Sequence, residues 1–142
     1  MFTPQAILLL CLFLQIGLTF WAIMRMGTLR LKSLKTGETR YQDIALASES
    51  YPDYVKPHQN NAHNQFETPV LLYVLVILAN SSGVANWGVA VGAVIYIVAR
   101  FLHRAVHVGK NDLKKRIGTF ISGLIGLFIG WISLGLGFLG II

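Results

Sequence analysis

The chain has 142 residues, enough for a single domain. Hydrophobic residues make up 54% of it and charged residues 13%, about half the share of roughly 25% that soluble domains carry. This composition excludes a disordered chain and an ordinary water-soluble globule, and it indicates a membrane protein. The single cysteine, Cys11, excludes a disulfide framework and a cysteine-based zinc site. The formal net charge of +6 must then be explained by where the basic residues lie.

The first predicted span covers residues 4–24, which contain no charged residue. Its length matches the ~20 residues that cross ~30 Å of hydrocarbon. A signal peptide is disfavoured because no basic residue precedes the apolar run and no small-x-small cleavage site ends it. Cys11 lies inside this run and is interpreted as a small buried or lipid-facing hydrophobic residue. Residues 25–56 follow as an extramembrane loop of mixed charge, for which we predict no separate domain.

The second predicted span must begin well before its apolar part. The purely apolar stretch 70–79 is half a crossing, and a helix cannot stop midway through lipid with open backbone groups. Pro57 suits a first helical position, so we predict one helix over residues 57–80, with a kink at Pro69. This helix brings four polar residues to one face at spacings i, i+3, i+4 and i+7, namely Asn60, His63, Asn64 and Glu67.

The third and fourth predicted spans cover residues 85–108 and 117–141, and a polar turn at residues 80–86 joins the second span to the third. Because this turn is short, the second and third spans are antiparallel neighbours, and their polar faces are expected to meet. The polar face of the third span consists of Tyr96, Arg100, His103, Arg104 and His107. The sequence therefore predicts an all-α integral membrane protein built as a four-transmembrane-helix bundle.

The basic residues define an orientation for the four spans. All 12 lysines and arginines lie in residues 25–56 and 100–116. The positive-inside rule places both segments in the cytoplasm and both termini outside. Topology thus accounts for the positive charge, and nucleic acid is excluded as a partner.

Small residues recur at four-residue spacing in the fourth span, at Gly118, Ser122, Gly126 and Gly130, and the third span carries Gly88 and Gly92. Such spacing favours close helix packing, although glycine is also common as filler in membrane helices.

Two interpretations of the polar cluster remain open. Glu67 is the only acidic residue within a predicted span, and leaving it unpaired would cost on the order of 3 kcal/mol. It either forms a structural ion pair with Arg100 or belongs to a site for a polar ligand. His103 and His107 are spaced to bind a metal, but no HExxH or DxD pattern accompanies them, so no metal site is assigned. A small metal or proton transporter that uses Glu67 and the histidines is a third functional alternative.

Two segments resemble motifs of one family. Asn61-Ala62-His63-Asn64-Gln65-Phe66-Glu67-Thr68-Pro69-Val70 resembles the helix-two signature of the MAPEG proteins (membrane-associated proteins in eicosanoid and glutathione metabolism), with Asn64 and Glu67 as its Asn-x-x-Glu core. Ala99-Arg100-x-x-His103-x-x-x-His107 resembles the helix-three motif. The chain looks like a divergent, bacterial-type member.

The resemblance implies a homotrimer that binds glutathione between subunits near the cytoplasmic face, where the thiolate attacks a lipophilic substrate. Asn64 and Glu67 would hold polar groups of the peptide, and His103 and His107 would donate from their rings. Arg30 would stabilise the thiolate and is the one catalytic assignment. The full set of expected ligand-binding residues is Asn60, His63, Asn64, Glu67, Arg100, His103, Arg104, His107 and Lys114.

Asn60 departs from the family pattern. Members that use glutathione usually carry arginine at this position, and a neutral amide cannot replace a guanidinium that binds a carboxylate in bidentate fashion. The resemblance therefore leaves two functions. One is a glutathione-dependent transferase or peroxidase acting on a lipophilic small molecule, and the other is a non-catalytic protein of the same fold that binds membrane lipid or a protein partner.

Overall fold

The computed structural model describes residues 3–45 and 50–142. The described part is helical, with α1 (Pro4–Lys35), α2 (Tyr41–Ile44), α3 (Lys56–His63), α4 (Pro69–Ser81), α5 (Trp87–Val108) and α6 (Leu113–Phe138). Three of these helices, α1, α5 and α6, are long and apolar enough to cross a membrane, while α4 is a shorter apolar helix. The prediction of an all-helical membrane fold is confirmed.

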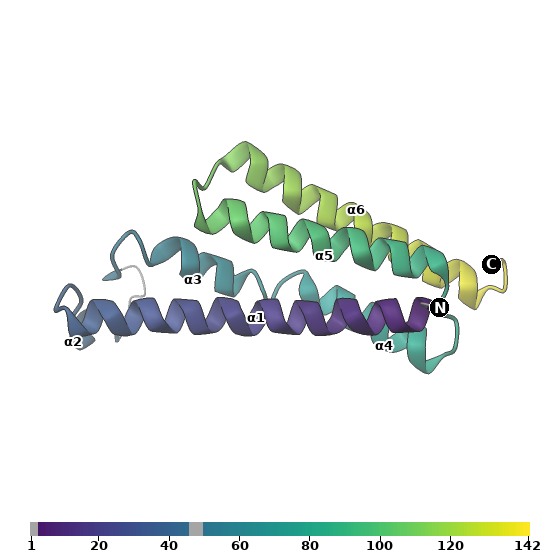
Figure 1. The fold of residues 1–142 in the computed structure, drawn as a ribbon, viewed down its shortest axis with the longest axis horizontal. Coiled ribbons are helices and arrows are strands. Elements are labelled where there is room, and N and C mark those ends of the chain that lie inside the picture. The colour runs from purple at the N-terminus through teal and green to yellow at the C-terminus, as the bar shows by residue number, and fades with distance from the viewer. Residues whose placement is uncertain (1–2, 46–49) are drawn as a thin grey trace.

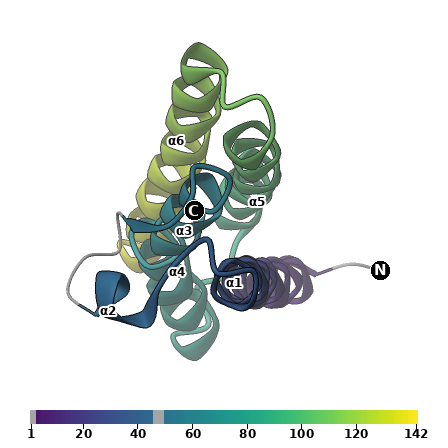
Figure 2. The same cartoon turned by 90° about the vertical axis from the view of Figure 1, so that its left-hand side faces the viewer.

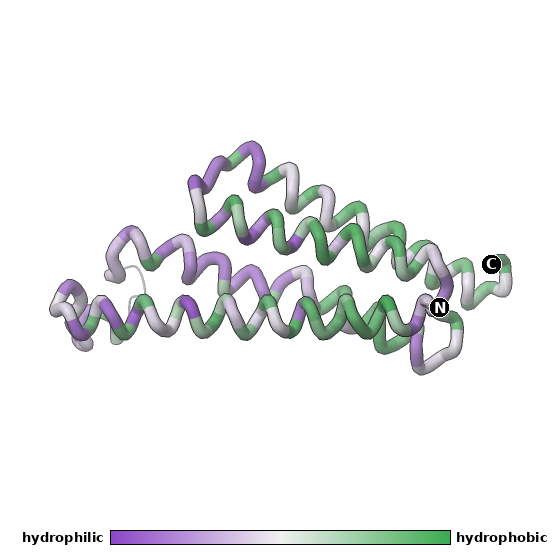
Figure 3. Tube along the Cα trace, in the orientation of Figure 1, coloured by the Kyte–Doolittle hydropathy of each residue, from purple (hydrophilic) through white to green (hydrophobic). Residues whose placement is uncertain are grey.

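Four helices, α1, α4, α5 and α6, surround a common hydrophobic core. α1 runs along most of the molecule, and α5 and α6 form an antiparallel pair beside it (Figure 1). Seen from the end, the order around the bundle is α1, α5, α6 and α4, and each of these neighbours is in contact (Figure 2). Polar residues gather at the end that holds α2, α3 and the loop at 109–112, which we call the basic end (Figure 3). The opposite end is the apolar end.

α1 is longer than a membrane crossing requires. It begins at an N-cap where the Thr3 hydroxyl accepts from the Ala6 amide at 3.2 Å, and it ends before Gly37, whose φ of 75° favours glycine. Its 32 residues span about 48 Å. The expected loop at 25–56 thus begins as eleven further residues of helix, 25–35. Their packing is stabilised by a small second core in which Leu29 of α1 contacts Tyr51 and Val55.

The predicted continuous helix over residues 57–80 is wrong, because the structure divides it into α3 and α4. Pro69 has no N–H to donate to the Gln65 carbonyl, and its ring disfavours helix in the preceding turn. The chain instead makes tight turns, in which Gln65 N bonds to Ala62 O at 3.1 Å and Phe66 N bonds to His63 O at 2.9 Å. Residues 64–68 therefore form a break, after which Pro69 begins α4.

The predicted glycine packing lies within the chain, between α5 and α6. A Cβ added at Gly92 would lie 2.6 Å from both the Gly126 carbonyl oxygen and the Gly130 nitrogen, so only glycine permits this approach. Gly118 has open space around it and takes no part in this contact. We call the contact among Gly92, Gly126 and Gly130 the glycine seam. It is continuous with the main hydrophobic core, in which Cys11 is buried as expected.

Candidate functional site

Four basic side chains of α5 are buried at the basic end. Arg100, His103, Arg104 and His107 are each between 2% and 4% exposed. α5 places them on its inner side because its outer side carries apolar residues such as Val98 and Leu102. An arginine stays charged when buried, so its partners decide what each one does.

Arg100 binds the break between α3 and α4. Its Nη2 donates to the carbonyl oxygen of Asn64 at 2.9 Å. Asn64 is the C-cap of α3, where a positive charge is favoured by the helix dipole. The alternative of a Glu67–Arg100 ion pair is not what forms: across residues 3–45 and 50–142 the single ion pair joins Lys56 to Asp53. The break turns the Glu67 side chain outward, where it is exposed.

The side chains that α3 turns inward differ from those expected. Asn61 and Gln65 are fully buried, whereas Asn60, His63 and Glu67 are exposed and Asn64 is half-buried. The prediction extended helical spacing from residue 60 to residue 67, but the helix ends at His63. Gln65 Oε1 accepts from Gln15 Nε2 of α1 at 3.0 Å, and Gln65 Nε2 donates to the Asn61 carbonyl at 3.1 Å. These bonds fix the break against α1.

His103 lines a small pocket between the break, α5 and the start of α6. Its Nδ1 lies 3.1 Å from the Arg116 carbonyl oxygen and 3.3 Å from the Thr119 hydroxyl. Its Nε2 is buried and has no partner within the described residues. The pocket has a volume of about 210 Å³ and is lined by Asn64, His103, Arg116, Ile117 and Phe120. We call it the polar pocket.

The loop before α6 positions Arg116 at this pocket. Asn111 has a φ of 51°, a conformation that asparagine tolerates better than most residues. Its side-chain oxygen accepts from Arg116 Nη1 at 2.9 Å. Asp112 caps α6 by accepting from the Lys115 amide at 3.2 Å. Arg116 thereby lines the polar pocket, and Asn111 holds its guanidinium.

The expected single polar face of α5 has two parts. His107 packs edge-on against His103, with ring centroids 5.5 Å apart, on the side of α6. Arg104 lies on the side of α1 and α3, where its guanidinium stacks 4.1 Å from the Trp21 ring centroid and its Nη1 donates to Asn61 Oδ1. Nowhere in the described chain do three or more His, Cys, Asp or Glu side chains gather as metal ligands.

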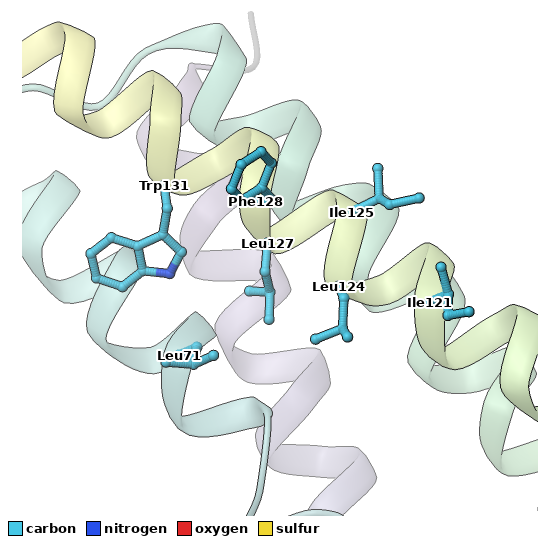
Figure 4. A pocket seen from close by; sticks show the side chains of 7 residues that line it. All are labelled: Leu71, Ile121, Leu124, Ile125, Leu127, Phe128 and Trp131. Atoms are coloured by element: carbon cyan, nitrogen blue, oxygen red, sulfur yellow. The ribbon is translucent and has the colours of Figure 1, made fainter.

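An apolar groove adjoins the polar pocket. It has a volume of about 490 Å³ and lies between α4 and α6, lined by Leu71, Ile121, Leu124, Ile125, Leu127, Phe128 and Trp131. Figure 4 shows Leu124, Leu127 and Trp131 of α6 directed toward α4, with Leu71 across from them. Ile117 and Phe120 of the polar pocket precede Ile121 and Leu124 of the groove by one helical turn. One stripe of α6 therefore links the two.

Arg30 and Lys114 are two further predicted site residues that lie away from the polar pocket within the chain. Arg30 stacks over the Tyr51 ring at 5.0 Å, about 14 Å along α1 from Trp21. Lys114 is exposed in the first turn of α6.

Sequence reasoning missed Gln15, Asn61, Gln65 and Arg116. Gln15 carried a usable signal, because a polar amide in the middle of an apolar span needs a partner.

The comparisons with known proteins agree with this architecture. The model of the MAPEG family matches residues 8–136, nearly the whole chain. No curated protein and no solved structure gives a significant match. The family match, together with three helices able to cross a membrane, identifies an integral membrane protein. The chain belongs to the MAPEG family, which includes glutathione transferases and peroxidases as well as other members.

Proposed function

We propose that the protein is a membrane-embedded, glutathione-dependent transferase or peroxidase that acts on a lipophilic substrate. The observation that carries this proposal is the continuity between the polar pocket and the apolar groove along α6. A water-soluble thiol and an apolar electrophile need adjoining sites of opposite polarity. Residues 117–131 of α6 provide both on one stripe of the helix.

The polar pocket suits an anionic thiol. Arg116 lies at its rim, and Arg100 adds a buried positive charge bound to the Asn64 carbonyl. A thiol with a pKa near ~8.5 is mostly protonated at neutral pH, and a neighbouring guanidinium favours the thiolate. In conjugation, the thiolate sulfur forms a bond to carbon, and the leaving group departs with its electron pair. In peroxide reduction, two thiols form a disulfide while the O–O bond accepts two electrons and two protons.

The unpaired Nε2 of His103 is suited to a bound peptide. Its Nδ1 is engaged by the Arg116 carbonyl and the Thr119 hydroxyl, so Nε2 is the ring nitrogen left without a partner among the described residues. In this proposal His103 contacts glutathione, and Asn64 contributes from the opposite wall. Arg100 and His107 hold these two residues in place, through the bond to the Asn64 carbonyl and the packing against His103.

We further propose that the chain assembles as a homotrimer, with the basic end in the cytoplasm and both termini outside. Asn60, His63 and Glu67 are exposed on the outer side of α3 and the break. Polar side chains at membrane depth must face protein or water rather than lipid. A second copy covering this face would enlarge the polar pocket and bring Asn60, Glu67 and the partner's Arg30 toward it. Arg30 then retains its proposed role with the thiolate.

A second function, non-catalytic binding of lipid or a protein partner, is favoured by one observation. The polar pocket of about 210 Å³ is smaller than the roughly 300 Å³ at which ligand pockets usually begin. Asn60 also supplies no guanidinium where glutathione-binding members usually have one. In this alternative the groove binds lipid and the pocket holds no peptide.

An activity assay with paired variants separates these functions. Glutathione consumption is followed with an aryl halide and with a lipid hydroperoxide. Arg116→Gln should lower kcat/KM about 10-fold or more by losing thiolate stabilisation. Leu124→Trp should fill the groove and raise KM for the lipophilic substrate, with little effect on glutathione affinity.

The control is Arg40→Gln, which removes an exposed charge from the same end of the molecule and should leave activity unchanged. Absence of turnover with both substrate classes, in a wild-type protein that still binds lipid, would favour the second function. Equal losses in Arg116→Gln and Arg40→Gln would contradict the role of the polar pocket.

A further inference from the structure

Three basic side chains, together with a tryptophan and an asparagine, form a second group at the junction of α1, α3 and α5, apart from the polar pocket. It consists of Trp21 and Arg25 of α1, His58 and Asn61 of α3, and Arg104 of α5. Arg104 is 2% exposed and is held between the Trp21 ring and Asn61 Oδ1. We call this group the junction cluster. The helices that carry it are in mutual contact.

The junction cluster has positive charge without a negative partner. Arg25 lies within electrostatic reach of both Arg104 and His58. Over the described ranges, no carboxylate bonds to any member of the cluster. Arginine does not deprotonate to relieve the burial of its charge. The buried guanidinium of Arg104 is therefore contacted by the Trp21 indole and the Asn61 amide, whereas a buried guanidinium ordinarily pairs with an anion.

Three polar atoms of the cluster are buried and unpaired among the residues the structure describes. They are Arg104 Nε, Asn61 Nδ2 and His58 Nδ1. Two of these atoms are obligate donors, and the histidine nitrogen donates in one tautomer or when protonated. Unsatisfied buried donors are rare in folded proteins and call for an explanation. Here they share one location with two guanidinium groups.

The depth of the cluster indicates what kind of anion it would meet. Arg25 is the first charge after the uncharged run 4–24, and Trp21 lies one turn deeper. Arginine and tryptophan so placed are typical of the membrane–water boundary, where lipid phosphates lie. Arg25 is exposed and His58 is half-buried, so the cluster is accessible from its rim. Guanidinium groups match the geometry of phosphate oxygens.

We propose that the junction cluster binds a phosphate group, with Arg25 at the rim, Arg104 beneath it, and Asn61 and His58 donating from α3. The phosphate belongs either to an anionic lipid headgroup or to a small phosphate in the aqueous phase. This site is separate from the polar pocket, since Arg104 contacts Trp21 of α1 and Asn61 of α3, whereas His103 contacts Arg116 and Thr119 of α6. A phosphate bound there would neutralise the charge of Arg104 and link α1 to α3 and α5 through hydrogen bonds.

Trp21 provides a direct probe, because Arg104 stacks on its ring. In a Trp87→Phe, Trp131→Phe background, Trp21 is the only tryptophan left of the three. The protein is held in maltoside detergent, which carries no phosphate, and titrated separately with inorganic phosphate and with short-chain phosphatidic acid. We expect a saturable change in Trp21 fluorescence. Arg104→Gln and Arg25→Gln should each weaken the apparent affinity about 10-fold.

The matched control is Arg40→Gln, which should alter the affinity less than about twofold because an exposed, distant charge is screened. Saturation by inorganic phosphate would identify a soluble ligand, and saturation by phosphatidic acid alone would identify a lipid headgroup. If Arg104→Gln does not fold, the exposed Arg25→Gln decides the result. Saturation by neither probe, or equal weakening in Arg25→Gln and Arg40→Gln, would overturn the proposal. Competition by glutathione would overturn the separation of the two sites.

Discussion

The apolar end and the basic end of the bundle are held together in different ways. At the apolar end, α5 and α6 meet through backbone contacts at Gly92, Gly126 and Gly130. At the basic end, α3 and α5 meet through hydrogen bonds from Arg100 and Arg104. The contact at the apolar end is close backbone packing that needs no further partner. The contact at the basic end leaves donors without acceptors, and both proposed polar binding sites lie there.

The distribution of unsatisfied atoms makes this contrast concrete. Among the described residues, the buried side-chain atoms without partners belong mostly to the basic end, including those of His58, Asn61, Arg100, His103 and Arg104. Gln15 Oε1, in the middle of the first apolar run, and Trp131 Nε1, beside the apolar groove, are the exceptions. Substitutions at the apolar end should therefore change stability. Substitutions at the basic end should change binding.

The largest expected effect is at the glycine seam. Gly126→Leu should destabilise the protein by at least about 3 kcal/mol, because its Cβ would lie 2.8 Å from backbone atoms of Gly92 and Tyr96 that cannot move aside. Thermal unfolding in detergent measures the loss. Gly118→Leu is the control, since that position of the same helix has open space. An equal loss in both variants would contradict the seam.

The bond between α1 and the break should give a smaller effect. Gln15→Leu leaves Gln65 Oε1 without its donor and should cost about 1 kcal/mol. Replacing both glutamines by leucine should recover only part of this loss, because Gln65 Oε1 is then removed rather than left unpaired, while the Asn61 carbonyl loses the Gln65 Nε2 donor. A double-mutant cycle by denaturant unfolding measures the coupling. Strict additivity of the two single substitutions would show that the bond does not contribute.

Tyr96→Phe tests the other anchor of the break. The Tyr96 hydroxyl lies 3.0 Å from the Thr68 hydroxyl, so its removal should cost about 0.5 kcal/mol. The loss should be local, and hydrogen exchange at residues 68–72 should quicken while exchange in the glycine seam stays unchanged. Uniform quickening across the molecule would mean that the break has no separate stability.

The smallest effect concerns the extramembrane part of the basic end. The Tyr54 hydroxyl donates to Glu38 at 2.8 Å, and this bond to a carboxylate raises the pKa of Tyr54. The stabilisation is present while the phenol is protonated and is lost as pH rises above about 10. Glu38→Gln should lower the pKa of Tyr54 in an ultraviolet titration, without a measurable change in stability. An unchanged pKa would mean that the bond does not persist in solution.

Much of this architecture could be predicted from the sequence. A long uncharged run is enough to predict a membrane helix, so α1, α5 and α6 could be predicted. The family could be predicted from its two motifs. The break between α3 and α4 was less predictable. Pro69 indicated a kink, but the extent of the break depends on Arg100, Gln15 and Tyr96, which lie on other helices and come close only in the fold.

The candidate site was predicted residue by residue with less success. Arg100, His103 and His107 are buried beside one another as expected, since helical spacing holds within α5. Asn61 and Gln65 were missed because helical spacing was extended through the break. Arg116 was missed because its place at the pocket depends on the loop before α6, where its carbonyl meets His103 and its side chain bonds to Asn111. Long-range contacts of this kind carry no local sequence signal.

The central claim is that the polar pocket binds glutathione, and calorimetry tests it most directly. Glutathione is titrated into the purified protein in mild detergent, then into Arg116→Gln and into the control Arg40→Gln. We predict saturable binding to the wild type and to Arg40→Gln, with a loss of about 10-fold or more in Arg116→Gln. Absence of binding to the wild type, or equal binding by all three proteins, would contradict the claim.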